Sequence, residues 1–128
     1  MTSHTVTTET VASWIAAYLD AWRSYDADAI ADLFSKDATY AYNPWETPMR
    51  GNTTIAESWL SDRDEPGTWE ADYRPVLIKD EAAIIVGETR YADGHSYSNL
   101  FQVMFDEDGR CASFVEWYIR HPKTKPGD

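Results

Sequence analysis

Basic residues, cysteine and long apolar runs are scarce in this chain. Its 128 residues carry 22 acidic against 11 basic side chains, which gives a formal net charge of −11. A negative field of this size repels phosphate backbones and anionic lipid surfaces, so we expect no nucleic acid and no membrane among its partners. Solubility alone would also account for such acidity.

No run approaches the roughly 18 apolar residues of a membrane-spanning helix. The threonine-rich residues 1–9 contain no apolar segment of the kind found in secretory signals. The single cysteine, Cys111, cannot form a disulfide within the chain, which fits a reducing compartment. These features predict a cytoplasmic protein.

Motifs for metals and nucleotides are missing as well. No two of the three histidines have metal-ligand spacing, and neither a glycine-rich phosphate loop nor a nucleophile elbow occurs. We therefore expect no metal and no cofactor. His95, in the turn Asp93-Gly94-His95, is interpreted as a solvated loop residue.

Aromatic residues, by contrast, are abundant, with six Trp and eight Tyr. Such side chains supply apolar area with a polar handle, which suits either a packed core or a ligand cavity. The length allows one domain, which we place at residues 8–120, with residues 1–7 and 121–128 as flexible tails.

Helical spacing marks the first part of the chain. Asp26 is predicted to cap a short second helix and Asn52 a third, with residues 37–42 as a brief strand between them. Thr8 is predicted to cap the first helix, whose apolar residues are Val11, Trp14, Ile15, Tyr18 and Trp22.

Four later segments are rich in β-branched and aromatic residues, at 69–78, 82–91, 96–105 and 111–120. Short polar turns separate them, which is typical of an antiparallel meander. Helices packed on one face of such a sheet predict an α+β domain.

A family resemblance rests on the order of five segments: AWRSYDADAIADLF, SKDATYAYNP, RGNTTIAESWL, DEAAIIVGETRY and DGRCASFVEWYI. With them the chain resembles the SnoaL-like group of the nuclear transport factor 2-like superfamily over residues 8–120. The resemblance implies a cone-shaped, curved antiparallel sheet wrapped round three N-terminal helices, the cystatin-like architecture, with a conical pocket. This fold hosts isomerases, cyclases, dehydratases, epoxide hydrolases and non-catalytic modules, so function depends on the site.

Steroid isomerases of this superfamily allow a comparison residue by residue. Their oxyanion-donating tyrosine falls on Tyr18, but their general-base aspartate falls on Tyr42 and their protonated aspartate near Asn99 or Phe101. Both catalytic carboxylates are missing, which argues against that mechanism.

Limonene-type epoxide hydrolases hold a water with an Asp–Arg–Asp cluster, a tyrosine and an asparagine. The tyrosine falls on Tyr40, the asparagine on Tyr42 and the last aspartate on Glu116. The remaining arginine and aspartate fall on Glu88 and Arg90 in reversed order. The resemblance therefore leaves epoxide hydrolysis open.

Strand alternation groups the candidate catalytic residues. Glu88 and Arg90 share one face of their strand, and Phe114, Glu116 and Tyr118 share one face of the last strand. The resemblance places both sets on the pocket side; alternation alone does not, because the opposite set on the last strand is at least as apolar. We predict that Glu116 acts as general acid or base, with Arg90 and Glu88 beside it. The alternative is an ordinary ion pair between Glu88 and Arg90 on a solvated face.

The predicted function is that of a cofactor-independent acid–base enzyme of the isomerase, cyclase, hydratase or epoxide-hydrolase type, acting on a small apolar oxygenated molecule. Alternatives from other classes are a non-catalytic small-molecule-binding module and a dimerisation module with the same fold. Trp45 is expected either at the pocket rim or as the packed anchor of its loop. The predicted substrate-binding residues are Tyr18, Tyr40, Tyr42, Trp59, Asn99, Phe101, Phe114 and Tyr118.

A homodimer through the open face of the sheet is also expected. The outward set on the last strands would form the apolar patch that such a dimer buries. Its residues are Leu100, Met104, Val115, Trp117 and Ile119.

Overall fold

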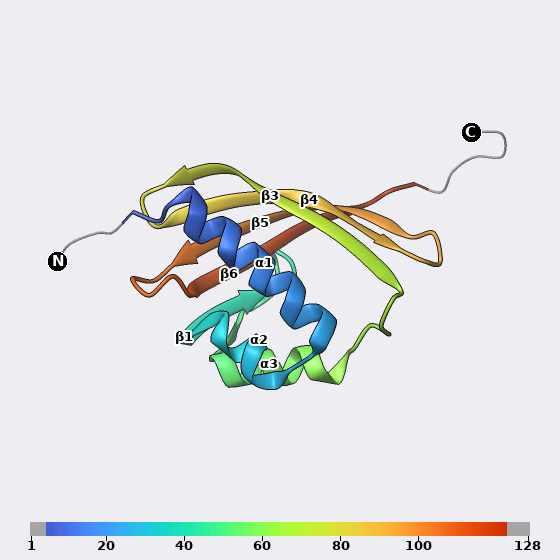
Figure 1. Cartoon of the computed structure of the whole chain (residues 1–128), viewed down its shortest axis with the longest axis horizontal. Helices are drawn as coiled ribbons and strands as arrows, with labels where there is room; N and C mark the ends of the chain where they lie inside the picture. Colours follow the sequence, from blue (N-terminus) through green and yellow to red (C-terminus); the bar gives the residue numbers. More distant parts are fainter. Residues whose placement is uncertain (1–4, 123–128) are drawn as a thin grey trace.

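The computed structural model describes residues 5–122. Within this range three helices precede most of a six-stranded sheet, which confirms the predicted α+β class (Figure 1). The elements are α1 (Thr8–Ser24), α2 (Ala27–Asp32), β1 (Phe34–Ala41), β2 (Met49–Arg50), α3 (Asn52–Ser61), β3 (Trp69–Lys79), β4 (Ala82–Tyr91), β5 (Ser96–Phe105) and β6 (Cys111–Arg120).

Helix α1 begins one residue earlier than its predicted cap implies. The N-cap is Thr7, whose Oγ1 accepts a hydrogen bond from the backbone N–H of Thr10 at 3.1 Å, so the predicted cap Thr8 is wrong by one position. Asp26 caps α2 as predicted, because its carboxylate accepts from the backbone N–H groups of Asp28 and Ala29.

The predicted cap of α3 is also wrong. Gly51 occupies the N-cap with φ of 99°, and no side chain caps the helix there, so Asn52 is already its first residue. A positive φ is cheap for glycine, which lets the chain turn sharply from β2 into α3.

The sheet runs in the order β2-β1-β6-β5-β4-β3. Strands β3 to β6 form the predicted antiparallel meander with nearly the predicted bounds, whereas β1 pairs with β6 in parallel. Strand β1 starts at Phe34, earlier than predicted, and the two-residue β2 is too short for alternation to reveal it.

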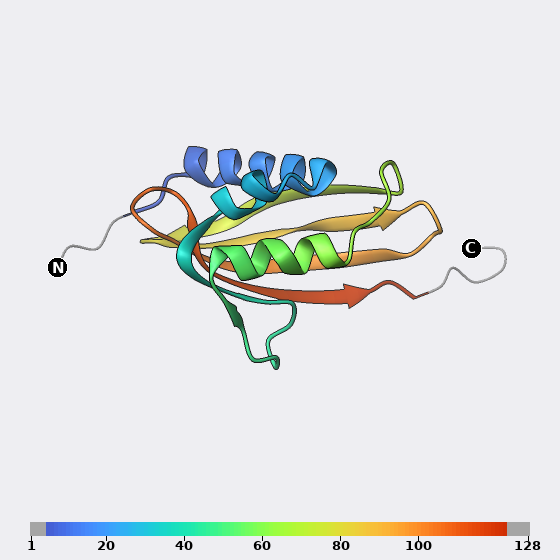
Figure 2. The same ribbon diagram turned by 90° about the horizontal axis from the view of Figure 1, so that it is seen from below.

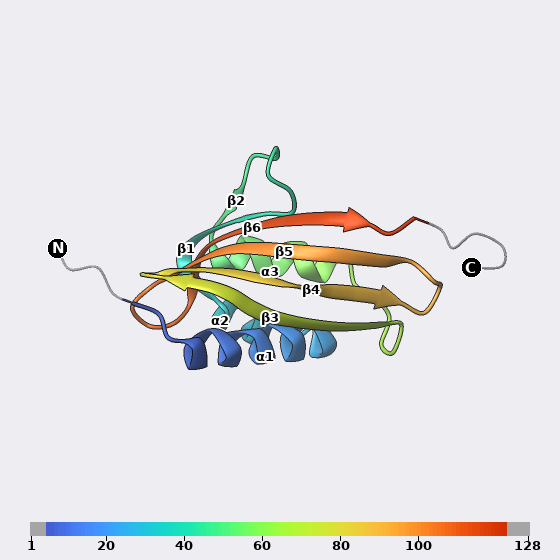
Figure 3. The ribbon, with the colours of Figure 1, turned by 90° about the horizontal axis from the view of Figure 1, so that it is seen from above.

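All three helices lie on one face of the curved sheet, and α1 runs along β3 (Figures 1 and 2). The opposite face carries no described helix (Figure 3). The core fills the space between the helices and the concave face. Its largest fully buried side chains are Tyr40, Phe34, Phe101, Phe105, Phe114, Ile30, Ile55 and Ile85.

The predicted domain boundary at residue 8 lies inside ordered structure. Val6 is buried, and its N–H donates to the carbonyl oxygen of Asp80 at 2.8 Å. Residues 1–4 and 123–128, which make up most of the predicted tails, lie outside the described residues. None of the helices in the described range is long and apolar enough to cross a membrane.

Candidate active site

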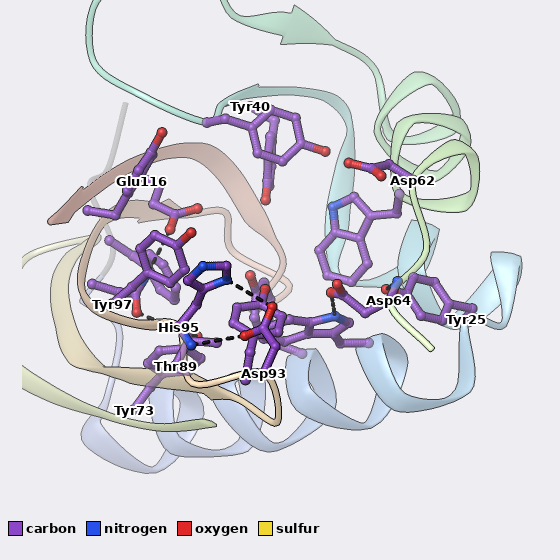
Figure 4. Close-up of a pocket in the computed structure, with 18 residues that line it drawn as sticks. Tyr25, Tyr40, Asp62, Asp64, Tyr73, Thr89, Asp93, His95, Tyr97 and Glu116 are labelled. Atoms are coloured by element: carbon purple, nitrogen blue, oxygen red, sulfur yellow. Dashed lines mark hydrogen bonds and ion pairs between the residues drawn. The ribbon is translucent and has the colours of Figure 1, made fainter. Parts of the chain in front are cut away.

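A cavity of about 500 Å³ opens between the concave face of the sheet, α1 and the end of α3. All eight tyrosines of the chain line it, together with Trp22, Trp59 and Phe101 (Figure 4). The volume falls in the range of small-molecule sites. The high tyrosine content therefore serves this pocket as well as the core.

Glu116 brings a carboxylate into the pocket from β6. It stands opposite Phe101 of β5, and one carboxylate oxygen accepts a hydrogen bond from Asn99 Nδ2 at 2.8 Å. Burial raises the pKa of Glu116 from its ordinary value of 4.5 to about 7, although the hydrogen bond from Asn99 lowers it. Near neutral pH this carboxyl group can therefore both accept and give a proton.

A chain of hydrogen bonds orients Glu116. The Thr89 hydroxyl donates its one proton to the amide oxygen of Asn99 at 2.9 Å. Thr89 therefore accepts the hydrogen bond that it shares with the Tyr73 hydroxyl. Thr89 and Asn99 are 3% and 8% exposed. Two buried polar side chains with defined partners hold the Asn99 amide in one orientation, with its N–H directed at the carboxylate.

The close approach of Tyr73 depends on Gly87, its direct partner across β3 and β4. A Cβ atom at position 87 would stand 1.9 Å from the Asp72 carbonyl oxygen and 2.4 Å from the Tyr73 ring. Only a residue without a side chain fits there, so Gly87 allows the hydrogen-bond chain to begin at Tyr73.

Tyr18 and Tyr40 line the same pocket as Glu116. Burial raises the pKa of both phenols well above its ordinary value, and the charge of Glu116 raises it further. Tyr40 stacks on Phe114 with ring centroids 4.5 Å apart, which fixes its ring. Both tyrosines thus remain protonated and can donate hydrogen bonds to an oxygen atom of a ligand.

The structure brings most of the predicted site residues together. Phe114 lies below the pocket as a fully buried support for Tyr40. The residues that line the pocket are Tyr18, Tyr40, Tyr42, Trp59, Asn99, Phe101, Glu116 and Tyr118.

Glu88 and Arg90 do not belong to this group, and the prediction that they meet Glu116 is wrong. Both line a hollow on the convex face, where Arg90 pairs with Glu88 at 3.5 Å and with Asp72 at 3.3 Å. Register explains the difference, since Gly87 faces Asn99 across β4 and β5 and Thr89 points inward, so residues 88 and 90 point outward. The alternative of an exposed ion pair is the one observed.

The predictions for Trp45 are wrong too. Its side chain is 84% exposed, so it is no packed anchor, and it contributes to the convex hollow rather than to the pocket rim.

Sequence reasoning missed several pocket residues at the ends of elements. His95 lines the pocket, and its Nδ1 lies 2.9 Å from an Asp93 carboxylate oxygen. Asp62 and Asp64, which follow α3, face it from the other side (Figure 4). The loop after α3 leads into β3, and the pairing of Trp69 with Tyr91 brings this loop beside the β4–β5 turn, where the Ala92 N–H donates to the Thr68 carbonyl oxygen at 2.7 Å.

Asp64 is fixed at the open end of the pocket. Its carboxylate accepts from Trp22 Nε1 at 3.0 Å, and its backbone N–H donates to the Tyr25 hydroxyl at 2.7 Å. Within residues 5–122, no group of three or more His, Cys, Asp or Glu side chains is arranged to hold a metal ion.

A curved sheet closed by three helices over a pocket is the fold of the nuclear transport factor 2-like class of proteins. The SnoaL-like domain family matches residues 15–124, so the chain belongs to that family. This confirms the resemblance deduced from the sequence. No curated protein matches the chain.

Solved structures of low sequence identity share the fold. The chain is similar to a proposed ketosteroid isomerase from Kribbella flavida (16% identity over 94% of this chain and 85% of the other, TM-score 0.69). It is similar to an NTF2-like protein of unknown function from Mesorhizobium loti (18% identity over 93% of this chain and 99% of the other, TM-score 0.67). It is also similar to an LEH-like epoxide hydrolase from M. tuberculosis (15% identity over 88% of this chain and 84% of the other, TM-score 0.62).

Proposed function

We propose that the protein is an enzyme that moves protons on a small oxygenated molecule, with Glu116 as the general acid and base. The observation that carries this proposal is the Glu116 carboxyl group, which lies in an aromatic pocket with its pKa raised by burial to about 7. A catalytic acid or base works best when its pKa lies near the working pH. No cofactor takes part in the proposed step.

The proposed step begins with a substrate whose carbonyl oxygen accepts hydrogen bonds from Tyr18 and Tyr40. Glu116 removes a proton from the neighbouring carbon, and negative charge develops on the oxygen as the enolate forms. The phenol hydroxyls stabilise that charge, as preorganised donors do in other enzymes. Glu116 then returns the proton to a second carbon, which completes an isomerisation, or to a leaving hydroxyl group, which completes an elimination.

Isomerisation, cyclisation and elimination are favoured over epoxide hydrolysis. The epoxide hydrolase comparison requires Glu88 and Arg90 beside Glu116, and both lie on the convex face. The pocket therefore offers no guanidinium group from Arg90 to share a nucleophilic water with Glu116.

A direct test uses cyclohex-3-enone and other β,γ-unsaturated ketones as probes. Wild-type protein should convert a probe of suitable shape to the conjugated enone, followed by ultraviolet absorbance, and should exchange its α-hydrogens in D₂O, followed by NMR. Glu116→Gln should abolish both reactions, while Glu107→Gln, in the exposed β5–β6 turn, should retain them. A fully active Glu116→Gln protein would disprove the proposal.

The convex face supports a homodimer as the assembled form. Trp117, Ile119 and Met104 are 47%, 72% and 39% exposed there, and Leu100 and Val115 are half-buried beside them. Apolar side chains gathered on an uncovered sheet face are typical of a protein interface. A dimer through this face would leave the concave pocket open to its ligand.

A further inference from the structure

We infer that the substrate carries a protonated amine, which Asp62, Asp64 and the tyrosine rings bind at the open end of the pocket. The oxygen function of the same molecule then reaches Glu116 at the other end. This inference rests on the function proposed for Glu116 and specifies the substrate class.

The charge of the pocket lining is the first reason. Its charged side chains are four carboxylates, from Asp62, Asp64, Asp93 and Glu116, and one histidine, His95. The His95 Nδ1 lies 2.9 Å from a carboxylate oxygen of Asp93, so this ring is engaged by one of the four carboxylates. An anionic ligand would enter against this field, whereas a cation would replace its lost hydration with carboxylate contacts.

The aromatic lining is the second and independent reason. Tyrosine and tryptophan rings carry negative charge density on their faces, which attracts ammonium groups in aromatic cages. Eight tyrosines together with Trp22 and Trp59 surround the cavity. The rings therefore favour a cation beside the carboxylates.

Asp64 lies directly among these rings. Trp22, which stacks on Trp69 with centroids 3.5 Å apart, donates its indole N–H to the Asp64 carboxylate. Burial and the nearby Asp64 charge raise the pKa of Tyr91, and the same two effects act on Tyr25. The carboxylate is therefore held in place beside two tyrosine rings before any ligand arrives.

The two ends of the pocket require two different groups on the ligand. Glu116 on one side of the pocket suits an oxygen-bearing centre, and Asp62 and Asp64 on the other side suit an ammonium group (Figure 4). A volume of about 500 Å³ leaves space between them for a compact apolar body such as a fused ring.

Three probes with the same ring test this assignment: 1-naphthylmethylamine, 1-naphthylmethanol and 1-naphthoate. Affinities are measured by calorimetry at pH 7, at low and at high salt. The amine should bind about tenfold more tightly than the alcohol, the carboxylate most weakly, and added salt should reduce the difference. Equal affinities for the amine and the alcohol would overturn the inference.

Charge variants locate the preference. Asp62→Asn with Asp64→Asn should bring the amine close to the alcohol in affinity, and Asn at position 64 still offers an oxygen to Trp22. Asp37→Asn with Glu107→Gln, at two exposed residues outside the pocket lining, removes the same two negative charges and should leave the preference intact. An equal loss in both proteins would mean that net charge, and not this site, selects the amine. Thermal unfolding checks that each variant is folded.

The binding assay needs no turnover, so the two hypotheses fail separately. If Glu116→Gln retains isomerase activity while the amine preference persists, the proposed reaction is wrong and the cation site stands. If Glu116→Gln loses activity while amine and alcohol bind alike, the acid–base function stands and the substrate class is wrong.

Discussion

Replacing Glu116 by glutamine should stabilise the protein at alkaline pH and abolish its activity. The pKa of Glu116 is about 7 in the folded state against an ordinary value of 4.5, a difference of about 2.5 pH units. Each unit corresponds to about 1.36 kcal/mol, so the ionised carboxylate costs the folded state roughly 3 kcal/mol. Glutamine keeps an acceptor for Asn99 and carries no charge to desolvate.

The direction of the pH dependence follows from which state loses its proton first. Because the folded pKa of Glu116 is raised, the unfolded chain ionises first as the pH increases. The contribution of this group to the free energy of unfolding is therefore largest below pH 4.5. It decreases as the pH rises and levels off above about pH 7. At pH 5 the folded wild type still holds its proton, so Glu116→Gln gains little there.

Urea denaturation at pH 5 and pH 8 measures this effect. The stability gain of Glu116→Gln over the wild type should be roughly 2–3 kcal/mol larger at pH 8 than at pH 5. Glu107→Gln, which alters an exposed glutamate, controls for the general effect of one charge. A gain of the same size at both pH values would refute the buried, proton-holding carboxyl group on which the proposed function depends.

Three further predictions concern the surroundings of Glu116 and the convex face. Asn99→Leu removes the hydrogen bond that lowers the pKa of Glu116, so this pKa should rise further in a carboxyl ¹³C NMR titration; a lower pKa would contradict the hydrogen-bond chain. Gly87→Ala forces β3 away from β4 and should cost at least about 2 kcal/mol in the free energy of unfolding. An unchanged denaturation midpoint would show that Tyr73 does not need the space. Ile119→Lys places a charge on the exposed apolar face and should turn a dimer into a monomer in sedimentation velocity; a wild type that already sediments as a monomer would rule out the dimer.

Periodicity and turn chemistry alone determine most of the fold of this protein. The alternation and turn residues after position 68 place β4, β5 and β6 at their observed bounds, because each strand and its polar turn are encoded by adjacent residues. Helix periodicity likewise identifies α1, and Asp26 marks the start of α2 through a local hydrogen bond. Caps shift by a residue where a neighbouring threonine or glycine competes for the same position.

Periodicity does not determine which face of each strand points to the concave side of the sheet. Alternation shows that Glu88 and Arg90 share a side, but it does not show which side is concave. In β4 the outward residues Ile84 and Val86 are about as apolar as the inward Ala83 and Ile85, so composition does not decide the face.

Only the tertiary structure decides the composition of the active site. Packing of the helices on the sheet selects the inward face of the β4–β5 hairpin, which turns Thr89 and Asn99 inward to support Glu116 and turns Arg90 out to solvent. The pairing of β3 with β4 places the β4–β5 turn, with His95, beside the loop that holds Asp64. Local sequence determines which residues lie on strands and turns, whereas the face that each strand turns inward depends on the packing of the whole core, and this decides which residues meet in the pocket.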